Sequence, residues 1–117
     1  MSDSFTTPGL VILQPGSLTV PYSFTFSVAS SATANDGSIP YDSTIVSAAV
    51  KAFDAGGTDR TTELIASSSV SSPVVSVSLK YPATTGEGVY SIEFVLTLST
   101  GAKMEFDFTR VHAEDIL

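Results

Sequence analysis

The 117-residue chain has no cysteine and no tryptophan, and its single histidine is His112. Without cysteine, no disulfide can staple the fold and no thiolate can bind a metal or serve in redox chemistry. Basic residues are also scarce, because five Lys and Arg stand against twelve Asp and Glu, for a formal net charge of −7. Such a surface repels phosphate backbones, so we expect no nucleic-acid partner.

A long apolar run and a secretory leader are missing as well. Although 43% of the residues are hydrophobic, no uninterrupted apolar run approaches the roughly 18 residues of a membrane helix. Residues 1–9 contain no Lys or Arg, and the apolar stretch 10–13 is too short for the core of a signal peptide. We therefore expect no membrane span, no secretion by a signal peptide, and folding in a cytoplasm.

What the sequence does contain is a strict alternation of apolar and polar residues. Between residues 18 and 28 every second residue is apolar: Leu18, Val20, Tyr22, Phe24, Phe26 and Val28. The same pattern returns near the C-terminus, at Tyr90, Ile92, Phe94, Leu96 and Leu98. A strand with one face in a core and one in water has this period, because side chains alternate across the pleat. The pattern predicts an antiparallel β protein.

Shorter segments of the same kind, separated by turn-forming residues, predict the remaining strands. We expect a first strand at 10–13 and others at 44–53, 75–79 and 103–111. The inward faces of the second and last of these should carry Val46, Ala48, Val50 and Ala52, and Met104, Phe106 and Phe108. Residues 61–65 fit either a short strand or a helical turn. Pro21 cannot donate a ladder hydrogen bond, so it should lie at an edge or a bulge.

Strand number and spacing predict the architecture. About seven strands, at intervals of about 10 to 15 residues, indicate an all-β, immunoglobulin-like antiparallel β-sandwich. We expect a single domain over residues 1–117, with an ordered core at about 10–111 and a shared aromatic centre of Phe24, Phe26, Phe94 and Phe106. Tyr90 begins the penultimate strand, where such folds place a tyrosine corner; an ordinary half-buried strand tyrosine is the alternative.

No constellation of residues points to catalysis. His112 follows the last core aromatic in what we expect to be a solvated tail, and the serines lack an activating elbow such as G-x-S-x-G. Glu93 should face Glu105 or Asp107 across the final hairpin, as glycosidase carboxylates do, but on the polar side of the sheet. A solvated outer face that keeps the sheet soluble is the favoured interpretation of these acids. We predict no catalytic residue and no enzyme activity.

Metal, cofactor and sugar sites have equally weak signals. Four acidic residues fall in expected loops: Asp36, Asp42, Asp54 and Asp59. No D-x-[DN]-x-[DN]-G series gathers them, and the glycine pairs join strand to strand, so we predict no metal and no cofactor. Tyr41 and Tyr81, each beside a proline, are the candidates for contact with a glycan or a partner; packing over the edge of the core is the alternative.

The order of the segments resembles a known group of proteins. The resemblance is carried by residues 37–40, 44–50, 62–65, 74–77, 86–94 and 96–106. These segments are similar to the small immunoglobulin-like structural proteins encoded among the tail, baseplate and head-tail genes of tailed bacteriophages and prophages. The resemblance implies a virion component that is assembled in the bacterial host cytoplasm. It also implies that the partners are other virion proteins or copies of the chain itself, as a homo-oligomer.

Two functions remain open at this point. The first is a non-enzymatic virion structural or assembly protein, which acts through protein–protein contacts at sheet edges, loops or the apolar terminus Ile116-Leu117. The alternative is a carbohydrate-binding or adhesion-type β-sandwich module, which would use Tyr41, Tyr81 and the loop at 29–43.

Overall fold

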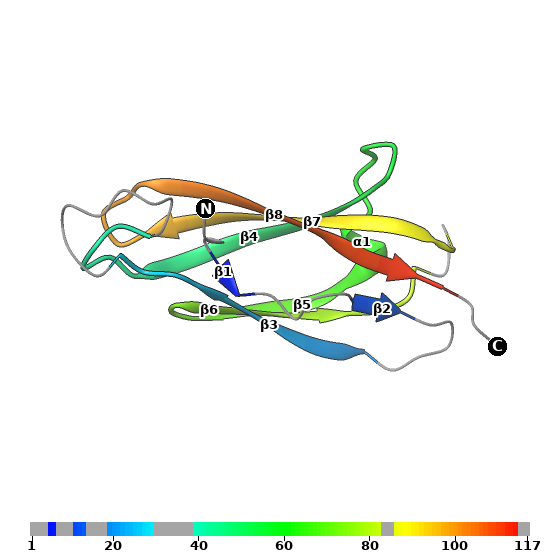
Figure 1. Cartoon of the computed structure of the whole chain (residues 1–117), viewed down its shortest axis with the longest axis horizontal. Coiled ribbons are helices and arrows are strands. Elements are labelled where there is room, and N and C mark those ends of the chain that lie inside the picture. The colour runs from blue at the N-terminus through cyan, green and yellow to red at the C-terminus, as the bar shows by residue number, and fades with distance from the viewer. Residues whose placement is uncertain (1–4, 7–10, 14–18, 30–38, 83–85, 115–117) are drawn as a thin grey trace.

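In the computed structural model the chain forms two β-sheets that pack face to face (Figure 1). The structure describes residues 5–6, 11–13, 19–29, 39–82 and 86–114. Seven strands have three residues or more, and the two-residue β1 is the eighth. The strands are β1 (Phe5–Thr6), β2 (Val11–Leu13), β3 (Val20–Phe26), β4 (Ile45–Asp54), β5 (Ile65–Ser71), β6 (Val74–Leu79), β7 (Gly88–Leu98) and β8 (Lys103–Ala113).

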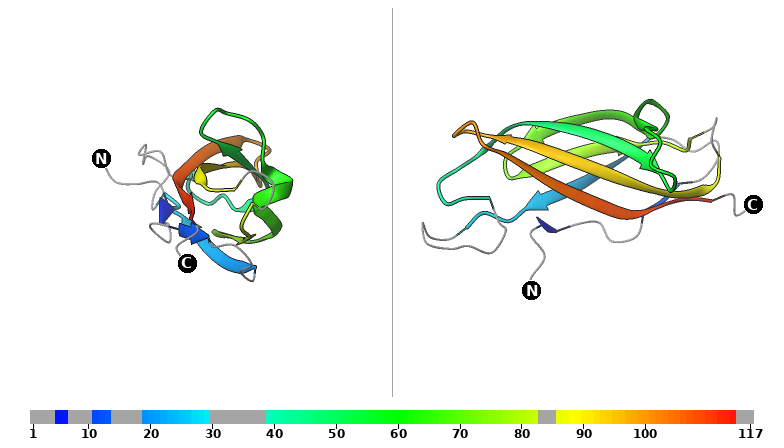
Figure 2. Two further views of the ribbon diagram at one scale, coloured as in Figure 1. Left: turned by 90° about the vertical axis from the view of Figure 1, so that its right-hand side faces the viewer. Right: turned by 90° about the horizontal axis from the view of Figure 1, so that it is seen from above.

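The two layers have the strand orders β1-β3-β6-β5, called here the first sheet, and β2-β8-β7-β4, the second sheet. Neighbouring strands are antiparallel except β2, which runs parallel to β8. Figure 2 shows β4, β7 and β8 side by side along the molecule, whose extents are 50 × 26 × 24 Å. The prediction of a mostly-β protein with two packed sheets is confirmed.

The core lies between the sheets, where the alternating residues of both meet. Val75, Val77 and Leu79 of β6 are fully buried, as are the alternating residues of β7 from Ile92 to Leu98. Phenylalanine rings form the centre. The ring centroids of Phe24 and Phe94 are 4.8 Å apart, and those of Phe26 and Phe106 are 4.9 Å apart. Because these pairs join β3 to β7 and β8, the predicted shared aromatic centre is confirmed.

The long alternation around β3 is buried only in its middle. Phe24 and Phe26 are buried and Tyr22 is half-buried, whereas Val20 and Val28 are exposed. Leu18 lies outside the described residues. Val28 follows the strand and forms an isolated bridge with Ile39, and it is Ile39 that takes the buried position there. Alternation therefore continued in the sequence beyond the part of the strand that the facing sheet covers.

Pro21 lies at a local edge, as predicted. Among the described residues, β1 pairs with β3 at Thr25 and Phe26 and no further along the strand. Pro21 is paired with Ser78 of β6 on one side, and no described strand flanks it on the other. Proline is tolerated at this position because no adjacent strand on that side requires a backbone N–H donor.

β4 departs from the predicted alternation at its N-terminal end. The sequence placed Val46 on the same face as Ala48, Val50 and Ala52, but Val46 is 62% exposed. The prediction is wrong because the ladder with β7 shifts by one residue between Ile45 and Ser47. A bulge of this kind reverses the side-chain direction, so Ile45 points into the core and Val46 points away from it.

β8 contains a second irregularity, which the alternation did not predict. Phe106 and Phe108 are buried, and so is Val111, three positions further on. The register with β7 shifts between Tyr90 and Ile92, which are paired with Val111 and Phe108. One extra residue in β8 restores the inward direction at Val111, so the strand keeps contributing to the core up to Ala113.

The ambiguous segment after β4 contains both a helical turn and a strand. The helix α1 (Thr61–Leu64) buries Leu64 and leads directly into β5. The sequence had not predicted β5, whose residues are Ile-Ala-Ser-Ser-Ser-Val-Ser. Serine has a weak preference for strands, and an edge strand has little buried surface to mark it in the sequence.

Candidate functional site

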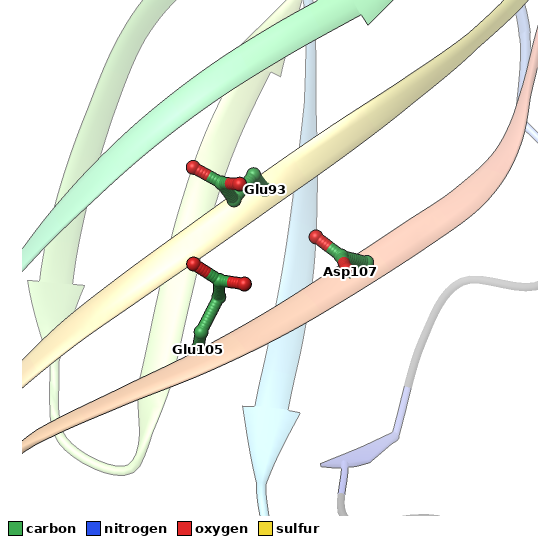
Figure 3. Close-up of side chains that lie close together, drawn as sticks. All are labelled: Glu93, Glu105 and Asp107. Carbon is green, nitrogen blue, oxygen red and sulfur yellow. The ribbon is translucent and has the colours of Figure 1, made fainter.

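Three carboxylates meet on the outer face of the second sheet, as the final hairpin predicted. Glu93 of β7 is paired in register with Asp107 of β8, and Glu105 lies two positions from Asp107 on the same face. One carboxylate oxygen from each lies within 4.8 Å of the others (Figure 3). Glu105 and Asp107 are exposed and Glu93 is half-buried.

This acidic cluster offers hard oxygen ligands of the type that calcium and magnesium prefer. The three side chains project side by side from one sheet face, and water reaches the two exposed ones. Lys51 of β4 is paired with Glu93 on its other side and partly balances the charge. The arrangement is that of a solvated, mutually repelling acidic face, and the geometry on its own assigns it no catalytic role.

A dense set of hydrogen bonds fixes the turn that follows β4. Asp54 Oδ1 accepts hydrogen bonds from the N–H groups of Gly56 (2.9 Å) and Thr58 (3.0 Å). Its Oδ2 accepts one from Arg60 Nε at 3.1 Å, and Arg60 also contacts Glu63 Oε2 at 3.3 Å. The carboxylate thus replaces the backbone acceptors that a tight turn leaves unused.

A second aspartate in this turn acts in the same way at the start of α1. Asp59 Oδ1 accepts hydrogen bonds from the Thr61 N–H (2.9 Å) and from the Thr61 hydroxyl (2.6 Å). The Thr61 hydroxyl oxygen accepts the N–H of Ala52 at 3.0 Å, which ties α1 to the outer edge of β4.

The pKa values of the turn residues follow from these bonds. The hydrogen bond from the Thr58 backbone, followed by that from the Arg60 side chain, lowers the pKa of Asp54 below its usual range. The Thr61 hydroxyl lowers the pKa of Asp59, and Asp54 raises the pKa of Arg60. Each charge is held in its ionised form by a partner within the turn. The network therefore stabilises local structure and presents no activated acid or base.

A hollow of about 300 Å³ lies between this turn and the start of β7. Its walls come from residues 54–56 and 87–90, with Arg60 between them. Asp54 and Arg60, two of its charged residues, are already paired with each other. A ligand in the hollow would have to compete with that pair for its polar contacts.

His112 lies within β8, where the sequence had placed a solvated tail. It is paired in register with Ile12 of β2 and with Val89 of β7. Its Nδ1 lies 3.5 Å from Glu114 Oε1. The side chain is about one-third exposed. The extension of β8 beyond the bulge explains this position, because the strand continues to Ala113.

The structure separates the two tyrosines that were candidates for glycan or partner contact. In the β3–β6 pair, Thr25 faces Val74 and Val20 faces Leu79. Tyr41 lies two residues after Ile39, which forms a bridge with Val28 just beyond the end of β3, and Tyr81 lies two residues after the end of β6. The two tyrosines therefore lie at opposite ends of the sandwich. Tyr41 is 53% exposed, whereas Tyr81 is half-buried against the core. One sugar cannot contact both rings.

Tyr90 has the hydrogen bond expected of a tyrosine corner. The side chain is 3% exposed, and its hydroxyl donates to the Gly86 carbonyl oxygen at 2.8 Å. Gly86 precedes the tyrosine by four residues, in the turn that leads into β7. The docking candidates Ile116 and Leu117, and the loop acid Asp36, lie outside the described residues.

No protein-family model matches this chain, and a search of curated proteins finds no significant match. The resemblance to phage structural proteins therefore rests on the sequence segments named above. Within the described ranges, no helix has the length and apolar character needed to cross a membrane.

Sequence reasoning missed the unequal division of charge between the two sheets. β3, β5 and β6 contain no Asp, Glu, Lys or Arg. The charged residues of the long strands all belong to the second sheet: Lys51, Asp54, Glu93, Lys103, Glu105, Asp107 and Arg110. One signal was available, since residues 64–79 form a charge-free stretch in a chain with a net charge of −7.

The outer face of the first sheet is correspondingly neutral and made of small side chains. Ser76 of β6 is paired with Ser23 of β3 on one side and with Ser69 of β5 on the other. Because Val75 and Val77 point into the core, this row of three serines points outward. The neighbouring row is Pro21, Ser78 and Ser67.

Proposed function

We propose that this chain is a non-enzymatic structural or assembly protein of a tailed-phage-type virion, and that it acts through protein–protein contacts. It would fold and assemble in the cytoplasm of a bacterial host. The observation that carries the proposal is the neutral first sheet of an otherwise strongly acidic chain.

A solvated sheet face in an acidic protein ordinarily carries charge, because charge keeps the molecule soluble and apart from its neighbours. The second sheet has such a face, with Glu93, Glu105 and Asp107 upon it. The first sheet has serine, threonine, proline and valine on its outer face instead. A neutral face of small side chains can approach another protein surface closely without burying an unpaired charge. The contrast supports a protein contact on this side.

An immunoglobulin-like topology is part of the proposal. In such sandwiches strands A, B, E and D form one sheet, and C, F and G form the other. If the strands are lettered in chain order with β2 as A′, the two sheets have the orders A-B-E-D and A′-G-F-C. The hydrogen bond from the Tyr90 hydroxyl to Gly86 supports the same assignment, because Tyr90 lies at the start of strand F.

The polar clusters support a non-enzymatic role. Asp54, Asp59 and Arg60 are engaged within their own turn. The group of Glu93, Glu105 and Asp107 contains no histidine, and the basic side chain beside it, Lys51, is paired with Glu93. The charged residues of these two groups thus have structural or solubilising explanations.

The direct test is whether the protein is a stoichiometric part of purified particles. We expect antibody detection and mass spectrometry to find it in particles from the organism that encodes it, and capsid, tail or terminase genes beside its own. A protein present only in the particle-free fraction, and encoded far from such genes, would contradict the proposal.

A pair of matched variants tests which face makes the contact. Ser76→Glu places a charge at the centre of the first sheet's outer face, and Thr97→Glu does so on the second sheet; both positions are half-buried. We expect Ser76→Glu to reduce incorporation into particles and Thr97→Glu to leave it unchanged. Equal incorporation of both folded variants would argue against a role for the neutral sheet.

A further inference from the structure

The edge of the first sheet formed by β5 is open to another strand. β5 is the last strand in the order β1-β3-β6-β5, and no described strand pairs with its outer side (Figure 1). An edge strand leaves alternate N–H and C=O groups without ladder partners, which makes it a template for strand addition. The four residues Ala66 to Ser69 are all exposed.

β5 lacks the features that usually protect such an edge. Native edge strands carry charged residues, proline or frequent bulges that prevent pairing with other chains. β5 has no charged residue and no proline. Its ladder with β6 shifts between Ile65 and Ser67 and is then regular from Ser67 to Ser71. Five consecutive residues therefore present a regularly paired, neutral edge.

The other edges of the described sheets are short or partly occupied. β1 has two residues and β2 has three. Both ends of the outer edge of β4 are bonded, because the Ile45 N–H donates to Ser72 Oγ and the Ala52 N–H to Thr61 Oγ1. The Ala52 carbonyl also accepts the N–H of Arg60. Two further stretches have no described strand on their outer side: residues 103–110 of β8, which carry Lys103, Glu105, Asp107 and Arg110, and the start of β3, which contains Pro21. β5 is the long open edge of the described sheets that has neither a charge nor a proline.

The charge of the chain indicates which protein pairs with the β5 edge. A different protein that binds this chain through its net charge of −7 would be basic, but β5 has no acidic residue with which such a protein could pair. A second copy of this chain carries the same net charge, so it can approach only where both surfaces are neutral. The edge that meets this condition in both copies is β5.

We propose that two copies of the chain pair through β5, antiparallel about a two-fold axis, so that their first sheets join into one eight-stranded sheet. This inference rests on the proposed function, because it names the partner in the protein–protein contact. If the two-fold axis passes beside Ser69, all five residues of the regular stretch from Ser67 to Ser71 can pair, and Ser69 of one copy lies opposite Ser69 of the other. Ser67 then faces Ser71, and Ser68 faces Val70.

This register keeps like side chains on like faces. Ser67, Ser69 and Ser71 lie on the outer face with their β6 partners Ser78, Ser76 and Val74. Directly opposed residues of an antiparallel pair share a face. The outer face of the dimer would thus continue from one copy to the other without a charge. The half-buried Val70 would extend the inner face on each side of the axis.

The test measures mass against concentration by analytical ultracentrifugation. We expect the wild-type chain to reach twice the monomer mass and to stop there. Ser69→Lys places two like charges directly opposite each other at the axis, and should raise the dimer dissociation constant by about tenfold or more. Ser23→Lys adds the same charge to the same outward-facing row, but on β3, two strands away from the β5 edge. This control variant should leave the dissociation constant unchanged.

Crosslinking tests the register and does not depend on the lysine variants folding. The chain has no cysteine, so Ser69→Cys introduces a single thiol. Facing residues of an antiparallel pair have Cα atoms about 4.5 to 5.5 Å apart, within the range of a disulfide. We expect mild oxidation to crosslink Ser69→Cys quickly, and Ser23→Cys slowly or not at all.

Several results would overturn the inference. A wild-type chain that stays monomeric at every concentration would do so, as would equal crosslinking of the two cysteine variants. Growth in mass beyond a dimer would also contradict it, because a two-fold contact closes on itself. A monomer that is still found in purified particles would overturn this inference alone, whereas a dimer that is absent from particles would overturn the proposed function alone.

Discussion

The hydroxyl of Tyr90 donates a hydrogen bond to the carbonyl oxygen of Gly86, 2.8 Å away, and so fastens the start of β7 to the turn before it. Gly86 has a φ of 73°, which glycine adopts without strain. The bond closes one end of the sandwich, beside the hollow that Asp54 and Arg60 also line.

Loss of this bond should reduce stability measurably. Tyr90→Phe keeps the buried ring and removes only the hydroxyl, so we expect the free energy of unfolding to fall by about 1 kcal/mol. Urea denaturation measures the change. Tyr41→Phe removes a hydroxyl from an exposed ring and serves as the control. Equal stability of both variants and the wild type would mean that the Tyr90 bond contributes nothing.

Truncation of the Phe94 side chain should be costly to stability. Its ring contacts both Phe24 and Phe26, with centroids 4.8 and 5.5 Å away. Phe94→Ala would leave a cavity between the sheets and lower the free energy of unfolding by about 3 to 5 kcal/mol. Val46→Ala, at an exposed position of β4, should change it by less than about 0.5 kcal/mol. Denaturant midpoints that do not separate the two variants would contradict the packing described above.

The turn at Asp54 should make stability depend on pH in the acid range. Folding lowers the pKa of Asp54, so its contribution is fully present above the unfolded-state pKa of about 4 and is lost as the pH falls through the folded-state pKa. Asp54→Asn should therefore destabilise the protein at neutral pH, and the difference from wild type should shrink below about pH 4. Thermal unfolding across this range measures the difference.

A second aspartate variant separates the turn from a general loss of charge. Asp107→Asn removes a carboxylate from the acidic cluster, where its neighbours are also acidic. We expect no destabilisation at neutral pH from this change. If Asp54→Asn and Asp107→Asn behave alike, the hydrogen bonds of the turn are not the cause of the pH dependence.

Repulsion within the acidic cluster should respond to salt. Glu105→Gln removes one of three carboxylates whose oxygens lie within 4.8 Å of one another. We expect a gain in stability of a few tenths of a kcal/mol at low ionic strength, which disappears at about 1 M salt because of screening. Urea denaturation at both salt concentrations measures it. Stabilisation of the wild type, but not of Glu105→Gln, by millimolar calcium would instead identify a cation site.

Local patterns determined a large part of this fold. The direction of a strand side chain depends on its position in the pleat, so alternation alone placed Phe24, Phe94 and Phe106 in the core. A short turn fixes the register of a hairpin, which is why the approach of Glu93 to Asp107 could also be predicted. These properties depend on residues that are neighbours in the sequence or are joined by one turn.

Tertiary structure alone decided the features that depend on distant partners. The bulge that exposes Val46 exists because β4 must fit the ladder of β7, and the end of the sandwich that holds Tyr41 depends on how β3 pairs with β6. The serine-rich β5 becomes a strand only because β6 supplies its hydrogen bonds. The sequence by itself determined which side chains face inward within the regular stretches of the strands, whereas the bulges at Val46 and before Val111 depended on the partner strand. Long-range pairing determined which strands share a sheet, and so gathered the charge on one sheet and left the other neutral.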